Sequence, residues 1–127
     1  VGLNVTRKTI LRRDRFCQRL AAARPERMRA FLADVSRPYF EFGRKESGSD
    51  ACVMHDPLAV GVAIDPTFVV TDRLLCDVVD APGLTRGMML VRPESRLSGA
   101  VPVAVATAVD ADRFIDMFLD VVCGGSR

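Results

Sequence analysis

The sequence predicts an α/β fold in which helices cover a mixed sheet. Segments toward both ends of the chain carry apolar residues at helical spacing, and a series of short strand-like segments lies between them. No internal repeat interrupts this order, which runs strand, three helices, four strands and a closing helix. A chain of 127 residues is long enough to bury a single core.

The first expected elements are a strand followed by a helix. Residues Val1–Thr6 alternate apolar with small or polar side chains, which is the period of a strand with one face inward. Residues 9–23 carry apolar side chains near helical spacing and several alanines, which favour a helix.

A second helix is expected to begin at Pro25, because proline fits the first position of a helix. Apolar residues then recur at steps of three and four from Met28 to Tyr39. Proline inside a helix removes a hydrogen bond, so Pro38 should kink this helix or end it at Arg37. The polar residues 41–50 would then form a mobile loop.

A short apolar helix is expected over Leu58–Ile64. The sequence Asp56-Pro57 opens it, with Asp56 as the N-cap and Pro57 as the first helical residue. The sequence Asp65-Pro66 closes it.

The rest of the chain predicts strands and one more helix. Strand-like segments lie at Thr67–Val70, Leu74–Val79, Gly87–Val91 and Val101–Val109, with a turn at 81–83 and a polar loop at 92–100. Pro102 fits only near the start or edge of its strand. Asp110 can cap the last helix, whose apolar side chains follow the i, i+3, i+4 pattern.

Composition and charge exclude some classes of protein. No apolar run approaches the ~20 residues of a membrane span, and a chain that is 49% hydrophobic with net charge +2 should collapse rather than stay disordered. Residues 1–45 carry 12 basic and 4 acidic side chains, whereas residues 46–127 carry 6 and 12. The two parts should attract each other or another charged surface. The arginines form no single stripe and no aromatic platform accompanies them, so nucleic-acid binding is disfavoured.

Four cysteines stand far apart, and none has the spacing of a zinc site: Cys17, Cys52, Cys76 and Cys123. Their apolar neighbours favour small buried thiols in a reducing compartment, with disulfides as the alternative.

His55 is the only histidine, and it stands at the mouth of the short apolar helix. A histidine beside a loop can donate or accept a proton there, although Asp56-Pro57 alone explains a helix start. A nucleophilic pair of Cys52 and His55 lacks an orienting third group. The carboxylate pairs Asp72/Asp77 and Asp110/Asp112 are better explained as turn and cap residues.

One stretch resembles a known family. The segment from Val53 to Pro66, with His55-Asp56-Pro57-Leu58-Ala59 at its centre, is similar to the C-terminal signature of the inosine-uridine preferring nucleoside hydrolases. Further pieces match in order: Val1–Thr6 resembles the family's Leu-Asp-Val-Thr strand, Leu84–Gly87 its Leu-Thr-Arg-Gly turn, and Val105–Phe118 its closing strand and helix.

The resemblance implies hydrolysis of the N-glycosidic bond of ribonucleosides with the help of a calcium ion. Asp56 would be a calcium ligand, and His55 would be the acid that protonates the departing base. Protonation offsets negative charge on the base in the transition state, and calcium prefers oxygen ligands. A histidine here, where other members have tryptophan, resembles the non-specific and pyrimidine-preferring branch. The resemblance also implies a cytoplasmic homo-oligomer.

The chain departs from the family pattern in what it lacks. The family's N-terminal cluster of aspartates, which would supply the other calcium ligands and the base that activates water, is absent, and so is its Glu-Trp-Asn segment. Because calcium takes ~6 to 8 oxygens, Asp56 alone cannot hold it. The chain begins at Val1 without an initiator Met. We therefore expect residues 1–127 to be a single partial domain, the C-terminal part of such an enzyme, whose partner would be the missing N-terminal portion.

Two other classes stay open. The chain could be a catalytically silent α/β scaffold or association module, which predicts an exposed apolar edge. A nucleic-acid binder would be retained on DNA or RNA in a steeply salt-dependent way.

Overall fold

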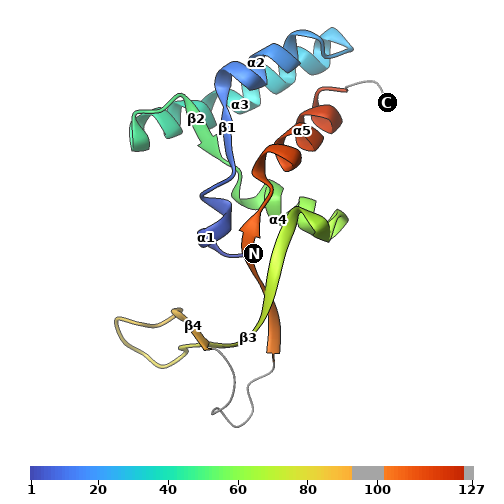
Figure 1. Ribbon diagram of the computed structural model, residues 1–127. Coiled ribbons are helices and arrows are strands. Elements are labelled where there is room, and N and C mark those ends of the chain that lie inside the picture. Colours follow the sequence, from blue (N-terminus) through green and yellow to red (C-terminus); the bar gives the residue numbers. More distant parts are fainter. Residues whose placement is uncertain (93–101, 125–127) are drawn as a thin grey trace.

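The computed structural model describes residues 1–92 and 102–124 (Figure 1). The elements follow in the order α1 (Leu3–Thr6), β1 (Ile10–Arg12), α2 (Arg13–Ala21), α3 (Glu26–Ser47), β2 (Ala51–Val53), α4 (His55–Ile64), the 3₁₀ turn η1 (Pro66–Phe68), β3 (Val69–Val78), β4 (Met89–Arg92), β5 (Pro102–Val109) and α5 (Ala111–Val122). The mixture of helices and strands confirms the α/β class.

The described strands form two small antiparallel sheets. Strand β1 pairs with β2, with Leu11 opposite Cys52, and this pair brings the start of α4 next to the N-terminal segment. Strands β4, β3 and β5 form the second sheet in that order, with an irregularity in β3 between Val70 and Thr71. Figure 1 shows this second sheet extending away from the helices.

The expected strand over Val1–Thr6 is wrong, because this segment forms the single turn α1. The amides of Val5 and Thr6 both donate to the carbonyl of Gly2, so the backbone curls instead of extending. Val5 and Thr6 are buried, and the Asn4 side chain donates to the carbonyl of Ala106 in β5 at 3.0 Å. A side-chain hydrogen bond thus connects this segment to β5. The alternation of its six residues had instead suggested a strand with backbone hydrogen bonds to a neighbouring strand.

The expected break at Pro38 and the loop at 41–50 are also wrong, because α3 continues to Ser47. Tertiary packing outweighs the ~3 kcal/mol that an internal proline costs. Phe40, two residues beyond Pro38, is only 2% exposed, and its ring lies 5.6 Å from that of Phe16 in α2. The helix ends at Ser47 and is followed by the C-cap residue Gly48, whose φ of 70° favours glycine.

Other expectations hold with changed boundaries. The helix expected over 9–23 begins only at Arg13, after β1. The strand expected at 67–70 begins only at Val69, because Thr67 and Phe68 belong to η1, and it continues with the segment at 74–79 as the single strand β3, which ends at Val78. Pro102 begins β5, as expected, and Asp110 caps α5 by accepting from the Arg113 amide at 3.2 Å. The polar segment at 92–100 lies outside the described residues after Arg92.

One hydrophobic core joins α2, α3, α4 and α5. Its most deeply buried aromatic side chains are Phe40 and Phe114, and Phe114 packs edge-on against Phe68 at 5.7 Å. Leu58 of α4 is fully buried in this cluster. The core therefore fixes α4, and with it the position of His55, against α5.

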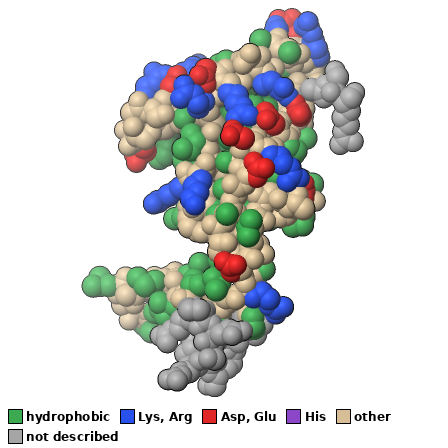
Figure 2. Space-filling view, in the orientation of Figure 1, with side chains coloured by type: hydrophobic (Ala, Val, Ile, Leu, Met, Phe, Trp, Pro, Cys, Tyr) green, Lys and Arg blue, Asp and Glu red, His purple; other side chains and the backbone are tan. Residues whose placement is uncertain are grey.

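The expected attraction between the basic and acidic parts of the chain is confirmed between α2 and α5. Arg15 contacts Asp112 at 2.9 Å and Asp116 at 2.7 Å, and Arg19 pairs with Asp120 one turn further along. Basic and acidic side chains lie interspersed on the helical part in Figure 2. Among the described residues, no helix is both long and apolar enough to cross a membrane.

Candidate active site at the start of helix α4

His55 and Asp56 are the first two residues of α4. The N-cap is Met54, which makes no side-chain capping bond, so the expectation that Asp56 caps the helix with Pro57 at its first position is wrong by two residues. The Asp56 carboxylate lies in the first turn, where the positive end of the helix dipole favours it. Both side chains are exposed.

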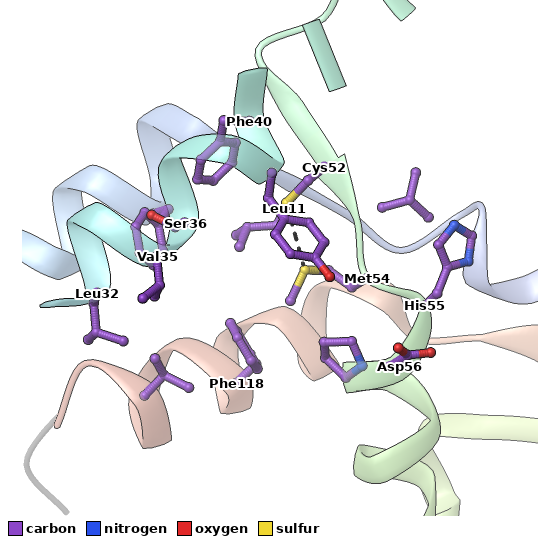
Figure 3. Close-up of a pocket in the computed structure, with 15 residues that line it drawn as sticks. Leu11, Leu32, Val35, Ser36, Phe40, Cys52, Met54, His55, Asp56 and Phe118 are labelled. Carbon is purple, nitrogen blue, oxygen red and sulfur yellow. Dashed lines mark hydrogen bonds between the residues drawn. The ribbon is translucent and has the colours of Figure 1, made fainter. Parts of the chain in front are cut away.

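A cavity of about 550 Å³ borders this helix start. Its walls come from α3, the β1–β2 pair and α5, and they are mostly apolar, with Tyr39, Phe40 and Phe118 among the aromatic side chains. His55 and Asp56 lie at one end of it, away from Leu32 (Figure 3). The structure thus brings the two residues singled out in the sequence to the edge of one apolar cavity.

The N-terminal segment contacts the same helix start through two hydrogen bonds. The Nδ1 atom of His55 lies 2.8 Å from Oγ1 of Thr6, whose residue is 5% exposed. The amide of Met54 donates to the carbonyl of Thr9 at 2.9 Å. Sequence reasoning did not single out Thr6, because nothing in the sequence connects it to a residue 49 positions away.

The described residues do not by themselves fit a calcium ion. They contain no group of three or more His, Cys, Asp or Glu side chains that could hold a metal, and Asp56 is the only carboxylate lining the cavity. Calcium requires ~6 to 8 oxygens, so most of its ligands would have to come from outside these residues.

The structure argues against the other candidate chemistry. Burial raises the pKa of the Cys52 thiol to about 11, so Cys52 is not an activated nucleophile for a pair with His55. Asp110 serves as a helix cap and Asp112 pairs with Arg15. Asp77 accepts from the amide of Val78.

All four cysteines are free, so the alternative of disulfides is not realised. Cys123 is buried, and Cys52 and Cys76 are half-buried. Cys17 is exposed, contrary to the expectation of a buried thiol, because it lies on a face of α2 that the core does not cover.

Comparison with known proteins decides the family. The sequence model described as inosine-uridine preferring nucleoside hydrolase matches residues 1–116, a range that contains His55, Asp56 and the N-terminal segment. The chain belongs to this family. An inosine-uridine preferring nucleoside hydrolase of Leishmania major is 32% identical over 91 residues, which cover 72% of this chain and 29% of that protein.

Solved nucleoside hydrolases share the fold of the chain. A purine-preferring ribonucleoside hydrolase from Gardnerella vaginalis has a TM-score of 0.80 and 33% identity, over 97% of this chain and 38% of its own. A plant nucleoside hydrolase has a TM-score of 0.82 at 22% identity, over 97% of this chain and 40% of its own. The chain therefore spans well under half the length of these nucleoside hydrolases.

Proposed function

We propose that this chain supplies part of the active site of a ribonucleoside N-ribohydrolase, which converts a ribonucleoside and water into ribose and a free base. The observation that carries the proposal is the adjacent His55 and Asp56 at the edge of an apolar cavity, inside the stretch that matches the family. Residues 1–127 would form one partial domain, completed by a portion outside this chain. Its length relative to the known hydrolases supports this. A cytoplasmic location and a homo-oligomeric state stay predictions.

His55 would act as the general acid. In the imidazolium form its Nε2 proton passes to the base while the C–N glycosidic bond breaks, and the electron pair of that bond leaves with the base. The oxygen of water bonds to the anomeric carbon, and the second proton of that water returns to solvent. The apolar walls of the cavity would lower the local dielectric constant beside the histidine, which strengthens the interaction between the imidazolium and the negative charge that develops on the base.

Asp56 would contribute one carboxylate ligand to a calcium ion. Its place in the first turn of α4, beside His55, leaves the carboxylate exposed. When bound, the ion would hold sugar hydroxyls and lower the pKa of the attacking water. The remaining oxygens would come from the portion outside the chain.

The test measures release of base from inosine and uridine, with and without calcium, by protein that contains this chain. His55→Asn keeps a polar group near Thr6 but removes Nε2, and it should lower kcat by about 100-fold or more. Asp56→Asn should raise the calcium concentration needed for half-maximal activity. A wild-type protein that releases no base from either nucleoside in calcium contradicts the proposal.

A second candidate function, an association module without catalysis, is favoured by one observation. Helix α3 carries a row of exposed apolar side chains, at spacings of three and four residues: Met28, Phe31, Val35, Tyr39 and Phe42. Absence of base release together with concentration-dependent association in sedimentation would support this candidate over the enzyme.

A further inference from the structure

We propose that Thr6 is a positioning residue for His55, and that its hydroxyl oxygen accepts a hydrogen bond from Nδ1–H and so reserves Nε2 for proton donation. This inference rests on the proposed function and adds a role that the family match does not assign. Thr6 belongs to α1, and its hydroxyl contacts the His55 ring at the start of α4.

The contact has the geometry of a good hydrogen bond. The 2.8 Å between Thr6 Oγ1 and His55 Nδ1 lies in the normal range, and the Thr6 residue is only 5% exposed, so bulk water competes little for its oxygen. Among the described residues the structure gives no hydrogen-bond partner for Nε2 of His55. One ring nitrogen is therefore tied to the protein and the other is available.

The turn that carries Thr6 is itself held on both sides. Asn4 donates to the carbonyl of Ala106 in β5 at 3.0 Å, and the carbonyl of Thr9 accepts from the Met54 amide at 2.9 Å. Met54 directly precedes His55, so the backbone bond fixes the distance between the turn and the helix start. The Thr6 hydroxyl then fixes the rotation of the ring, which the backbone bond cannot do.

The chemistry of a general acid explains why this partner suits the role. The two nitrogens of imidazole are distinct, and the group bonded to one sets the proton at the other. The imidazolium carries protons on both nitrogens. After Nε2 releases its proton to the base, the neutral ring keeps the Nδ1–H that Thr6 accepts. The same hydrogen bond therefore persists before and after the transfer, and the ring need not turn.

A neighbouring threonine provides a matched control. Thr9 lies just beyond the same turn and is fully buried, but its hydroxyl bonds to the carbonyl of Val5 at 3.4 Å and not to His55. Thr6→Val and Thr9→Val each replace a buried hydroxyl by a methyl group of similar shape. Only Thr6→Val should change the tautomer of the His55 ring. Thr6→Ser keeps the hydroxyl and should restore the wild-type behaviour.

The experiment reads the imidazole directly by ¹⁵N NMR, at a pH where the ring is neutral. The chain contains one histidine, so its ring signals need no assignment. We expect the Nδ1–H tautomer to predominate in the wild type, in Thr6→Ser and in Thr9→Val. Thr6→Val should shift the ring toward the Nε2–H tautomer that free imidazole side chains prefer. A wild-type ring that is mainly Nε2–H, which needs no variant to detect, overturns the proposal.

Kinetics of base release give the second readout. Thr6→Val should lower kcat about tenfold or more with little change in KM, because the acid and not the substrate loses its orientation. Equal losses in Thr6→Val and Thr9→Val would show a merely structural role and would overturn the inference. A wild type that shows the Nδ1–H tautomer but releases no base supports the hydrogen bond and contradicts the proposed function instead.

Discussion

Gly43 lies where helix α3 passes closest to strand β2. A Cβ atom at this position would overlap the carbonyl oxygen of Ala51, and main chain cannot move aside as a flexible side chain can. The sequence suggested that Gly43 belongs to a loop, where glycine provides flexibility. In the structure its lack of a side chain instead allows a helix and a strand to approach each other.

We therefore expect Gly43→Ala to lower the free energy of unfolding by about 1–3 kcal/mol, the usual cost of overpacking. The sign of the change in unfolding free energy distinguishes the two situations, because Gly→Ala at an open helical position stabilises the protein by about 1 kcal/mol. Urea unfolding followed by circular dichroism measures the difference. Ala33→Gly, at an exposed position of the same helix, controls for helix propensity and should cost about 1 kcal/mol. A stabilised Gly43→Ala protein would show that α3 and β2 are not in contact here.

Residue-scale prediction from sequence was limited by distance along the chain. His55 and Asp56 stood out because a lone histidine next to Asp-Pro at a helix start is a local pattern, and the structure does place both beside a cavity. Thr6 carries no local pattern. Its contact with His55 exists only after two segments 49 residues apart have folded together.

At the scale of elements, local propensity and tertiary packing compete, and packing decided two cases. Helix α3 passes through Pro38 because Phe40 beyond it is buried in the core. The segment containing Thr6 curls into α1 because its side chains, and not its backbone, contact β5. By contrast, the amphipathic pattern of α5 and its cap Asp110 agree with the tertiary structure, so both were predictable.

The contact between α2 and α5 gives a prediction at this scale. Arg15 bridges Asp112 and Asp116, and its side chain is 32% exposed, less than that of either partner. Exposed ion pairs contribute little singly, so Arg15→Ala should lower the free energy of unfolding by no more than about 1 kcal/mol. High salt should shrink this loss, because it screens the charges. Thermal melts in low and high sodium chloride measure both effects.

Arg12 provides the matched control for Arg15. It pairs with Asp14 only two residues further along the chain, with side chains 70% and 66% exposed, so this pair connects no segments that are distant in sequence. Arg12→Ala should therefore leave the free energy of unfolding unchanged within the error of the measurement. Equal losses in the Arg12 and Arg15 variants would mean that the pairs between α2 and α5 do not hold these helices together.

For the whole molecule, the sequence predicted the class of fold and the attraction between its two oppositely charged parts. It did not predict that the described strands pair antiparallel in two separate sheets. Pairing depends on which strand edges meet, and alternation within a single strand carries no such information. The attraction between the two parts could be predicted because it requires only the net charge of each part of the sequence. The exact partners depend on two helices lying side by side.

The response of the whole molecule to acid follows from three aspartates whose pKa values lie below the ordinary value. A side-chain hydrogen bond from Arg12 lowers the pKa of Asp14, one from Arg44 lowers the pKa of Asp50, and one from Thr67 lowers the pKa of Asp65. Asp65 also pairs with Arg113 at 2.6 Å, which ties the end of α4 to α5. In each case the folded state favours the ionised carboxylate.

A lowered pKa means that the folded state binds fewer protons than the unfolded state, so stability rises with pH in the range where these groups titrate. Their contribution should be complete above the ordinary aspartate pKa of about 4 and should be lost as the pH falls through the lower folded values. Denaturant unfolding at a series of pH values from 7 to 2.5 measures this loss. Asp65→Asn should reduce the slope below pH 4, because one of the three groups no longer titrates. If the free energy of unfolding stays constant to pH 3, the three carboxylates do not keep their partners in solution. The connection from α4 to α5 would then depend on the apolar contacts of the core, which include Leu58 and the packing of Phe114 against Phe68.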